Sequence, residues 1–454
     1  MKRAFLLFAV IPAISVTALA QTAPPAPVDA VPPPPPVGEP SSDRDDDAAR
    51  FLAGKHAITL DEARSRIGII EEAGRLRAEL AESFPDSFSA LSVTHEPRFT
   101  VLISATNGEA ILSARRSISP QLRQYIKVRT SKASRSSRVS DLKGLMRMLD
   151  EEGIDSNAYY DGDTDQVVVI VKDVAAAERA LSTAAGRKPN DFRLVQGSLL
   201  QQTAATPSGN YPVLSGDYIA PGHLYYNIHT DNSIAEGCTF GFKARYNGQT
   251  GLLTAGHCES TARGRPASDA LGTGYYQWTS NATKEAHWVE LYAPTLEFRS
   301  RSQNNVSDKY DFQFHPTPGF STYSSFYTAA SGGDLIRVNG EIAKSVVGKG
   351  YPLCRYGWKN GWNCGEVTNP DFFYEWENSR GFWLYRADNT PQSCVGGDSG
   401  GPVVTRPSSG YAKAAAIVVG YERTAKPSGL GFDDDCVFMP IDYINDIYDV
   451  RLVF

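Results

Sequence analysis

A serine flanked by glycines stands near the end of the chain, in the segment Gly397-Asp398-Ser399-Gly400-Gly401-Pro402. Glycines let the backbone turn tightly enough for the N–H groups of Gly397 and Ser399 to point into one pocket. Such a pocket stabilises the negative oxygen that forms when a hydroxyl attacks a carbonyl carbon. The segment predicts acyl transfer at a peptide bond, with Ser399 as the nucleophile and Gly397 and Ser399 as the oxyanion hole.

A serine nucleophile also needs a base that takes the hydroxyl proton. The segment Leu253-Thr254-Ala255-Gly256-His257-Cys258 places a histidine beside a cysteine at the end of an apolar strand. Taken alone, a histidine is more often a structural residue than a catalytic one. Found together with the serine segment, this one is predicted to be the base.

The third group should be an acid that orients the imidazole and stabilises its charged form. Asp311 opens an alternating strand in Tyr310-Asp311-Phe312-Gln313-Phe314-His315 and keeps the chain order His, Asp, Ser. We therefore predict Asp311 as the triad acid. Asp308 and Asp334 are the alternatives, although Asp334 lies close to Cys354 for the connecting strands that such a fold needs.

The composition of the chain narrows the function classes. Its 454 residues are enough for two or three domains, and 41% hydrophobic with 21% charged residues is ordinary for a soluble globular protein. The net charge of −6 gives no sign of a nucleic-acid partner or of an anionic membrane surface. We expect protein or peptide substrates, no nucleic acid, and no membrane contact once a leader is removed.

The first residues predict export. A positive start, an apolar run and a small-residue Ala18-Leu19-Ala20 site indicate a signal peptide over residues 1–20 and a secreted protein, periplasmic or extracellular. Residues 21–49 contain consecutive prolines and a run of charges, which predict an extended, disordered linker.

Residues 50–200 are interpreted as an α+β domain without cysteine. Apolar residues at spacings of three and four predict a helix over 60–84, and a second helix is expected after a Ser140 cap, with Gly153 as its stop. Residues 167–172 are expected to form a strand and 174–185 a further helix. The histidines of this domain, His56 and His95, are interpreted as isolated surface or loop residues.

The composition changes after a polar stretch at 201–215, the predicted processing segment. Helical periodicity is largely absent from 216–454, where short apolar and aromatic runs alternate with Gly, Asn and Ser, which predicts an all-β domain. The six cysteines of the chain all lie there: Cys238, Cys258, Cys354, Cys364, Cys394 and Cys436. In an exported protein they indicate disulfides, and no metal or other cofactor is expected because no Cys-x-x-Cys or His-x-x-x-His pair occurs.

The two chemical segments resemble the hallmark motifs of chymotrypsin-like serine proteases. Thr254-Ala255-Gly256-His257-Cys258 and Gly397-Asp398-Ser399-Gly400-Gly401-Pro402 carry this likeness. It extends to the bacterial group of alpha-lytic protease and the streptogrisins, through Gly237-Cys238-Thr239-Phe240-Gly241-Phe242 and the small loop between Cys354 and Cys364. The resemblance covers roughly residues 213–454.

The resemblance implies two antiparallel β-barrels with the site in their cleft, hence an all-β double barrel preceded by an α+β pro-domain. It implies the disulfides Cys238–Cys258, Cys354–Cys364 and Cys394–Cys436. It also implies a partner for Asp398, because a buried carboxylate beside the nucleophile needs one. In digestive relatives a newly cut N-terminus has this role, whereas the bacterial group uses an arginine at the position of Arg355.

The first domain is similar to the pro-regions of this group in Asn157-Ala158-Tyr159-Tyr160-Asp161 and in Thr164-Asp165-Gln166-Val167-Val168-Val169. The expected zymogen therefore carries its own folding aid and inhibitor, removed by a cut within 197–215. One alternative is that the domain stays attached as a binding module. Another is that the whole chain is an inactive protease homologue that serves as a secreted binding protein.

Two departures from the family lie beside the expected specificity pocket. Cys394 is one residue closer to Ser399 than in the streptogrisins, and the substrate strand reads Ile417-Val418-Val419-Gly420-Tyr421-Glu422 instead of ending in Ser-Gly-Gly. No aspartate stands just ahead of Cys394. We therefore expect an uncharged pocket for apolar or small side chains and no strict preference for Lys or Arg.

Overall fold

The computed structural model describes residues 46–454 apart from 109–117, 185–191, 198–217, 220, 223, 230–233, 259–269, 280–285, 293–310, 318–320, 323, 328–334, 377–378, 389–393, 406–410, 426–431 and 449. The predicted signal peptide, most of the predicted linker and the predicted processing segment lie outside these residues. Within them, no helix has the length and apolar character needed to cross a membrane.

The described helices are α1 (Asp47–His56), α2 (Leu60–Ser83), α4 (Pro120–Arg123), α5 (Arg135–Glu151), α6 (Val174–Ala184), α7 (Ile441–Tyr448) and the 3-10 turn η4 (Gly256–Cys258). The strands of the N-terminal segment are β1 (Phe88–Thr94), β2 (Thr100–Ala105), β3 (Ile126–Thr130), β4 (Ser156–Asp161), β5 (Gln166–Val171) and β6 (Phe192–Gln196).

The strands that follow are β7 (Tyr218–Ile219), β8 (Leu224–His229), β9 (Ile234–Thr239), β10 (Lys243–Tyr246), β11 (Gln249–Thr254), β12 (Ala270–Thr279), β13 (Ala286–Tyr292), β14 (Gln313–Pro316), β15 (Ser321–Thr322), β16 (Ser325–Tyr327), β17 (Leu335–Glu341), β18 (Pro352–Gly357), β19 (Gly361–Trp376), β20 (Ser379–Asp388), β21 (Pro402–Thr405), β22 (Ala412–Ala425), β23 (Phe432–Pro440) and β24 (Arg451–Leu452).

The helix predicted over 60–84 is confirmed as α2, which Thr59 caps by accepting a hydrogen bond from the backbone N–H of Glu62 at 3.2 Å. The Ser140 cap is wrong. Ser134 caps α5 instead, because its backbone is extended and its hydroxyl accepts from the N–H of Ser137 at 3.3 Å, which leaves Ser140 inside the helix.

Helix α1 begins at Asp47, inside the segment expected to be disordered up to residue 49. Two features explain the earlier start. Ala48 and Ala49 are buried, and the Asp47 carboxylate accepts a hydrogen bond from the Trp362 indole at 2.8 Å. The short apolar side chains therefore have a surface to pack on that sequence composition alone does not reveal.

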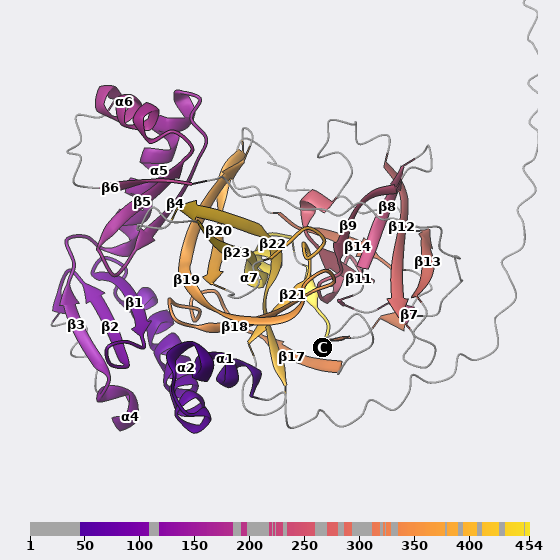
Figure 1. The fold of residues 1–454 in the computed structure, drawn as a ribbon, viewed down its shortest axis with the longest axis horizontal. Helices are drawn as coiled ribbons and strands as arrows, with labels where there is room; N and C mark the ends of the chain where they lie inside the picture. The colour runs from indigo at the N-terminus through magenta and orange to yellow at the C-terminus, as the bar shows by residue number, and fades with distance from the viewer. Residues whose placement is uncertain are drawn as a thin grey trace, which may run out of the picture. The chain divides into compact units, whose positions relative to one another are not determined.

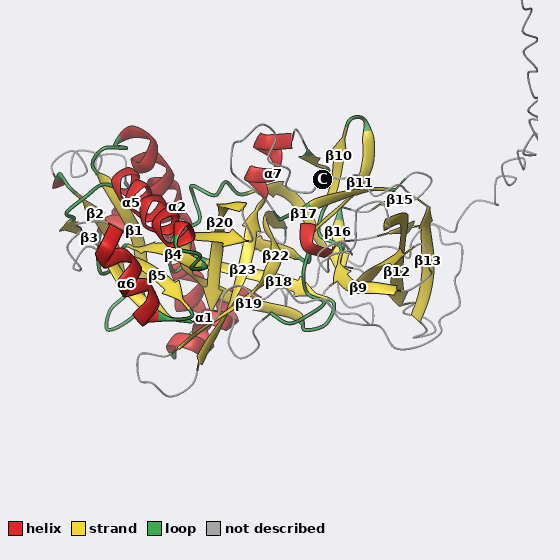
Figure 2. Ribbon diagram, turned by 90° about the horizontal axis from the view of Figure 1, so that it is seen from above, coloured by secondary structure: helices red, strands yellow, loops and turns green. Residues whose placement is uncertain are grey.

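The N-terminal segment contains one three-stranded sheet and three strands of a larger sheet, with helices packed on both (Figure 1). One sheet has the order β1-β2-β3 and contacts α2, and α5 and α6 pack on β4, β5 and β6. Figure 2 shows these helices in red, in contrast to the later part of the chain, where strands predominate.

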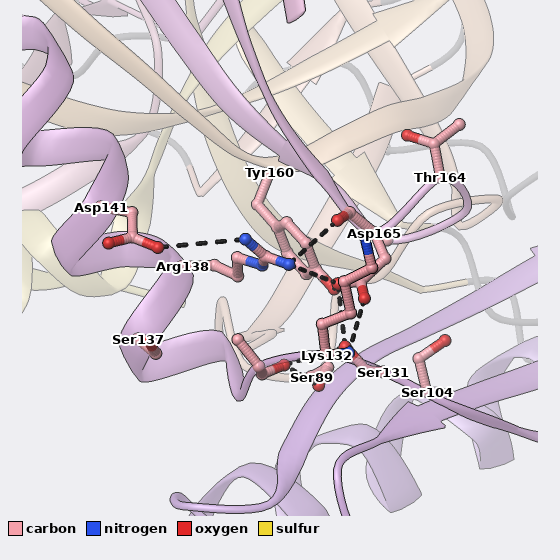
Figure 3. A network of polar contacts seen from close by, with 12 residues as sticks. Ser89, Ser104, Ser131, Lys132, Ser137, Arg138, Asp141, Tyr160, Thr164 and Asp165 are labelled. Atoms are coloured by element: carbon pink, nitrogen blue, oxygen red, sulfur yellow. Dashed lines mark hydrogen bonds and ion pairs between the residues drawn. The ribbon is translucent and has the colours of Figure 1, made fainter. Parts of the chain in front are cut away.

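A polar network fixes the turn between β4 and β5 (Figure 3). Asp165, at a φ of 55°, accepts hydrogen bonds from the hydroxyls of Ser131 at 2.8 Å and Tyr160 at 2.9 Å and from the N–H of Lys132 at 2.7 Å. Arg138 donates to the Asp165 carbonyl at 3.2 Å. The β4–β5 hairpin is thereby attached to the loop between β3 and α5.

The described residues after 218 form a mostly β structure, as the sequence predicts. One sheet has the order β14-β11-β10-β24 and another β13-β12-β8-β9. A third set joins β16, β17, β22, β21, β18 and β19, with β20 and β23 bridging β19 to β22. Most of these pairings are antiparallel, which brings segments far apart in sequence onto common sheets.

The N-terminal segment is joined to the later strands by main-chain pairing. Strand β4 pairs antiparallel with β19, with Tyr159 opposite Phe372 and Asn157 opposite Tyr374. Strand β6 lies against β22. One hydrophobic cluster also contains side chains of both parts, among them Leu91 and Val93 together with Val347 and Tyr351.

Candidate active site

Ser399 lies in a loop whose glycines are required by the backbone. Gly397 has a φ of 101° and Gly400 a φ of 85°, conformations that L side chains rarely adopt. A Cβ on Gly400 would lie 2.0 Å from Thr254 Oγ1, so a larger residue would displace β11 from the loop. Ser399 itself is fully buried, and its hydroxyl donates to the Val419 carbonyl on β22 at 3.4 Å.

Hydrogen bonds fix the orientation of the successive peptide groups of this loop. The Gly397 carbonyl accepts from Thr239 Oγ1 at 2.6 Å, and the Asp398 carbonyl accepts from the N–H of Gly401 at 3.0 Å. The Ser399 carbonyl accepts from the N–H of Thr239 at 2.8 Å. Because a trans peptide points its N–H opposite to its C=O, the Asp398 contact also sets the direction of the Ser399 N–H.

Asp398 is buried beside Ser399 and contacts a buried arginine. Arg355 Nη1 lies 3.3 Å from Asp398 Oδ2, and both side chains are completely shielded from solvent. Asp398 also accepts from the backbone N–H groups of Lys359 at 3.1 Å, Asn360 at 3.0 Å and Val395 at 3.2 Å. Several donors thus converge on one carboxylate, as a buried charge requires.

Burial acts on both members of this pair in opposite senses. It raises the pKa of Asp398, and Arg355 and the backbone N–H donors oppose that rise. It lowers the pKa of Arg355, and Asp398 opposes that change. An arginine remains charged in proteins, so Asp398 faces a cation as long as Arg355 is present.

The 3-10 turn η4 carries His257, whose side chain lies outside what the structure describes, and the residues on either side of it approach Asp311 and Ser399. On one side, Asp311 Oδ1 lies 3.0 Å from where a Cβ on Gly256 would be. On the other side, Cys258 Sγ lies 4.0 Å from the Ser399 carbonyl oxygen. Gly256 therefore lies close to the Asp311 carboxylate, and Cys258 lies close to the Ser399 carbonyl.

Asp311 is buried, with 4% of its surface exposed, and lies two residues before β14. The next polar residue, Gln313, donates from Nε2 to the Ala255 carbonyl at 3.1 Å, and β14 pairs with β11. These contacts attach the Asp311 strand to the turn that carries His257. The alternative acids Asp308 and Asp334 lie outside the described residues.

The disulfides pair as the resemblance implies: Cys238 with Cys258, Cys354 with Cys364, and Cys394 with Cys436. Each disulfide connects a segment of the candidate site to a neighbouring strand. The first anchors η4 to β9, the second closes the strands around Arg355, and the third ties the segment before Ser399 to β23.

Thr239 is a residue of the candidate site that the sequence does not reveal. Besides its contacts with Gly397 and Ser399, its hydroxyl accepts from the N–H of Trp358 at 3.0 Å, and its carbonyl accepts from Thr254 Oγ1 at 2.9 Å. The residue thus connects the serine loop, the histidine strand and the Arg355 hairpin. Its position next to Cys238 was the available signal, but a threonine beside a cysteine carries no chemistry of its own.

His95 lies in the β1–β2 loop, as predicted, but it is buried, His56 ends helix α1, and neither histidine is isolated. Their rings stack at 3.9 Å, and Nε2 of His56 and of His95 lie 2.9 Å and 3.2 Å from Glu366 Oε1 on β19. Lys55 Nζ lies 2.8 Å from the other carboxylate oxygen, and Arg66 donates to His95 Nδ1. Sequence separation concealed the cluster, because Glu366 lies about 300 positions from both histidines.

Metal binding is the alternative chemistry for two histidines and a carboxylate, whose ligand atoms here lie within 4.8 Å of one another. The contact with Arg66 opposes it. An arginine can only donate, so His95 Nδ1 accepts and the proton of the neutral ring is on Nε2, the atom that faces Glu366. The cluster is therefore better described as an ionic and hydrogen-bonded contact between the N-terminal segment and β19.

The chain resembles bacterial serine proteases of the chymotrypsin type. It is 22% identical to Serine protease 1 of Rarobacter faecitabidus over 373 residues, which cover 80% of this chain and 58% of that protein. The chain thus matches less than two thirds of that relative's length. A match of this length extends beyond residues 213–454 into the N-terminal segment.

Solved structures similar to the chain include two bacterial proteases. Thermobifida fusca Protease A is 21% identical, with 52% of this chain and 99% of that one covered and a TM-score of 0.34. The Nocardiopsis protease is 19% identical, with coverage of 53% and 100% and a TM-score of 0.34. No family model matches the chain.

We predict that Arg355→Met destabilises the protein by about 3–5 kcal/mol, because it leaves Asp398 buried without its cation. The measurement is chemical denaturation in a Ser399→Ala background, which excludes self-cleavage. Arg355→Met combined with Asp398→Asn should recover part of the loss. Arg50→Met, at a surface pair, should cost less than about 1 kcal/mol. Equal effects of the two arginine substitutions would contradict this prediction.

Burial lowers the pKa of His95 to about 4, with Glu366 opposing and His56, Arg66 and Lys55 adding to the decrease. The folded chain therefore binds this proton more weakly than the unfolded chain, and stability falls as pH decreases from 6.5 towards 4. In the Ser399→Ala background, the free energy of unfolding should fall by up to about 3 kcal/mol less over this pH range when His95 is replaced by glutamine (His95→Gln). If the free energy of unfolding depends on pH identically in the Ser399→Ala protein with and without His95→Gln, this role of His95 is refuted.

Proposed function

We propose that the chain is the precursor of a secreted serine endopeptidase with a chymotrypsin-like double barrel. The observation that supports the proposal most is the position of η4, where Gly256 lies close to the Asp311 carboxylate and Cys258 lies close to the Ser399 carbonyl. Ser399 is the nucleophile, His257 the base and Asp311 the acid that orients the imidazole.

In the proposed reaction, Ser399 Oγ attacks the scissile carbonyl carbon while His257 takes the hydroxyl proton. The N–H groups of Gly397 and Ser399 stabilise the oxyanion. Collapse of this intermediate breaks the peptide bond, and His257 returns the proton to the leaving amine. Water, activated by the same histidine, then hydrolyses the acyl-enzyme and regenerates Ser399.

The N-terminal segment, residues 50–200, is proposed to be a pro-domain that assists folding and inhibits the enzyme. Its strand β4 extends the sheet of β19, and β6 lies against β22, the strand that contacts Ser399. A template for β pairing is physically useful, because sheets built from distant segments fold slowly. The length of the match to Serine protease 1 of Rarobacter faecitabidus also supports a shared N-terminal region.

Secretion is supported by two features of the chain. The predicted signal peptide over residues 1–20 directs export, and the three disulfides form and persist in oxidising compartments. The protein would therefore reach the periplasm or the exterior before its N-terminal domain is removed.

A fluorophosphonate probe should label the processed protein at Ser399, and Ser399→Ala should abolish labelling and reduce peptide hydrolysis by about 10⁴-fold or more. Asp311→Asn should reduce hydrolysis by about 10⁴-fold, because the imidazole loses its orienting carboxylate. Asp308→Asn is the matched control and should retain activity. Absence of labelling in the folded, processed protein would favour the inactive binding protein instead.

Intact mass and N-terminal sequencing should find a secreted form that starts within 197–215, whereas the Ser399→Ala chain retains its N-terminal domain if cleavage is autocatalytic. A mature protein that starts near residue 21 would mean that the domain stays attached as a binding module.

A further inference from the structure

Strand β22 carries a buried acid close to the nucleophile. The Val419 carbonyl on β22 accepts the Ser399 hydroxyl, and Glu422 follows three residues later on the same strand. A strand advances about 3.3 Å per residue, so Glu422 lies about 10 Å further along. That spacing is within reach of a long side chain of a peptide bound at Ser399.

A second acid faces the first from the neighbouring strand. Asp435 on β23 is the register partner of Glu422, and directly paired residues of an antiparallel sheet have side chains on the same face. Asp435 also precedes Cys436, whose disulfide to Cys394 fixes β23 to the segment just before Ser399. Both acids are therefore held in place relative to the nucleophile.

The two paired acids bring two buried carboxyl groups together on β22 and β23. Glu422 is fully buried and Asp435 is 6% exposed. Like charges placed directly opposite each other on neighbouring strands are unfavourable, and burial amplifies their repulsion. A positively charged group of a ligand at this point is stabilised by the same field.

The N-terminal segment covers Glu422 with a neutral group. Asn157 Nδ2 on β4 donates to Glu422 Oε1 at 2.8 Å, and Asn157 is itself fully buried. Departure of the N-terminal segment would remove this donor from the Glu422 carboxylate. Asn157 thus contacts, in the precursor, the carboxylate that a substrate side chain would meet in the processed enzyme.

We infer that Glu422, assisted by Asp435, is a specificity residue that selects a lysine or arginine side chain of the substrate close to the scissile bond. The inference rests on the proposed protease function. The sequence predicts an uncharged specificity pocket, because no aspartate stands just ahead of Cys394. The inference replaces that prediction, because the acids come instead from the paired strands β22 and β23.

The test uses the processed enzyme and a mixed peptide library, followed by matched peptides that carry lysine or its neutral analogue norleucine at the preferred position. The wild-type enzyme should prefer the cationic peptide. Glu422→Gln should reduce the ratio of kcat/KM for lysine over norleucine about 10- to 100-fold, as expected for loss of a hydrogen bond to a charge. Glu341→Gln, remote on β17, is the matched control and should leave the ratio unchanged.

The outcomes separate this inference from the proposed function. A wild-type enzyme that cleaves the library without preferring lysine or arginine overturns the inference, and this result needs no variant to fold. An unchanged ratio in Glu422→Gln, with norleucine cleavage and fluorophosphonate labelling intact, also overturns it. Absence of both labelling and cleavage in the wild type refutes the protease function itself, and the inference with it.

Discussion

The buried ion pair between Asp398 and Arg355 is the constraint on which the rest of the site depends. A carboxylate in this position would be very unfavourable without its cation and its backbone donors. Meeting that requirement fixes β18 against the serine loop, and Thr239 then ties the loop to the strand before η4. The pair forms in a chain that retains its N-terminal segment, so the loop has its ordered geometry before any cleavage.

Carboxylates on the later strands also bind side chains of the N-terminal segment. Glu366 contacts Lys55, His56 and His95. Asp371 pairs with Arg135, Lys344 and Arg77, and although burial alone would raise its pKa, these cations hold it well below the ordinary value. Glu422 completes the set with Asn157. An interface based on ion pairs and main-chain pairing contains groups that water can solvate after separation, which is compatible with the proposed release of the N-terminal domain.

The sequence predicted those features whose signals are local. Periodicity located α2, and glycine and cysteine positions located the serine loop, η4 and, by resemblance, the disulfides. Features that depend on contacts between segments far apart in the sequence could not be predicted. The His56–His95–Glu366 cluster requires α1, the β1–β2 loop and β19 to meet, and the opposition of Glu422 and Asp435 requires the register of β22 on β23. The Ser134 cap was missed because one serine among several is chosen by backbone conformation.

The most direct test of the central claim is the rate of fluorophosphonate labelling of the processed enzyme before and after its α-amino group is chemically blocked. If Arg355 is the partner of Asp398, the new N-terminus has no part in ordering the loop, and the two labelling rates will be equal. A fall of about tenfold or more on blocking, equivalent to about 1.4 kcal/mol of lost transition-state stabilisation, would show that the N-terminus orders the site and would contradict this account.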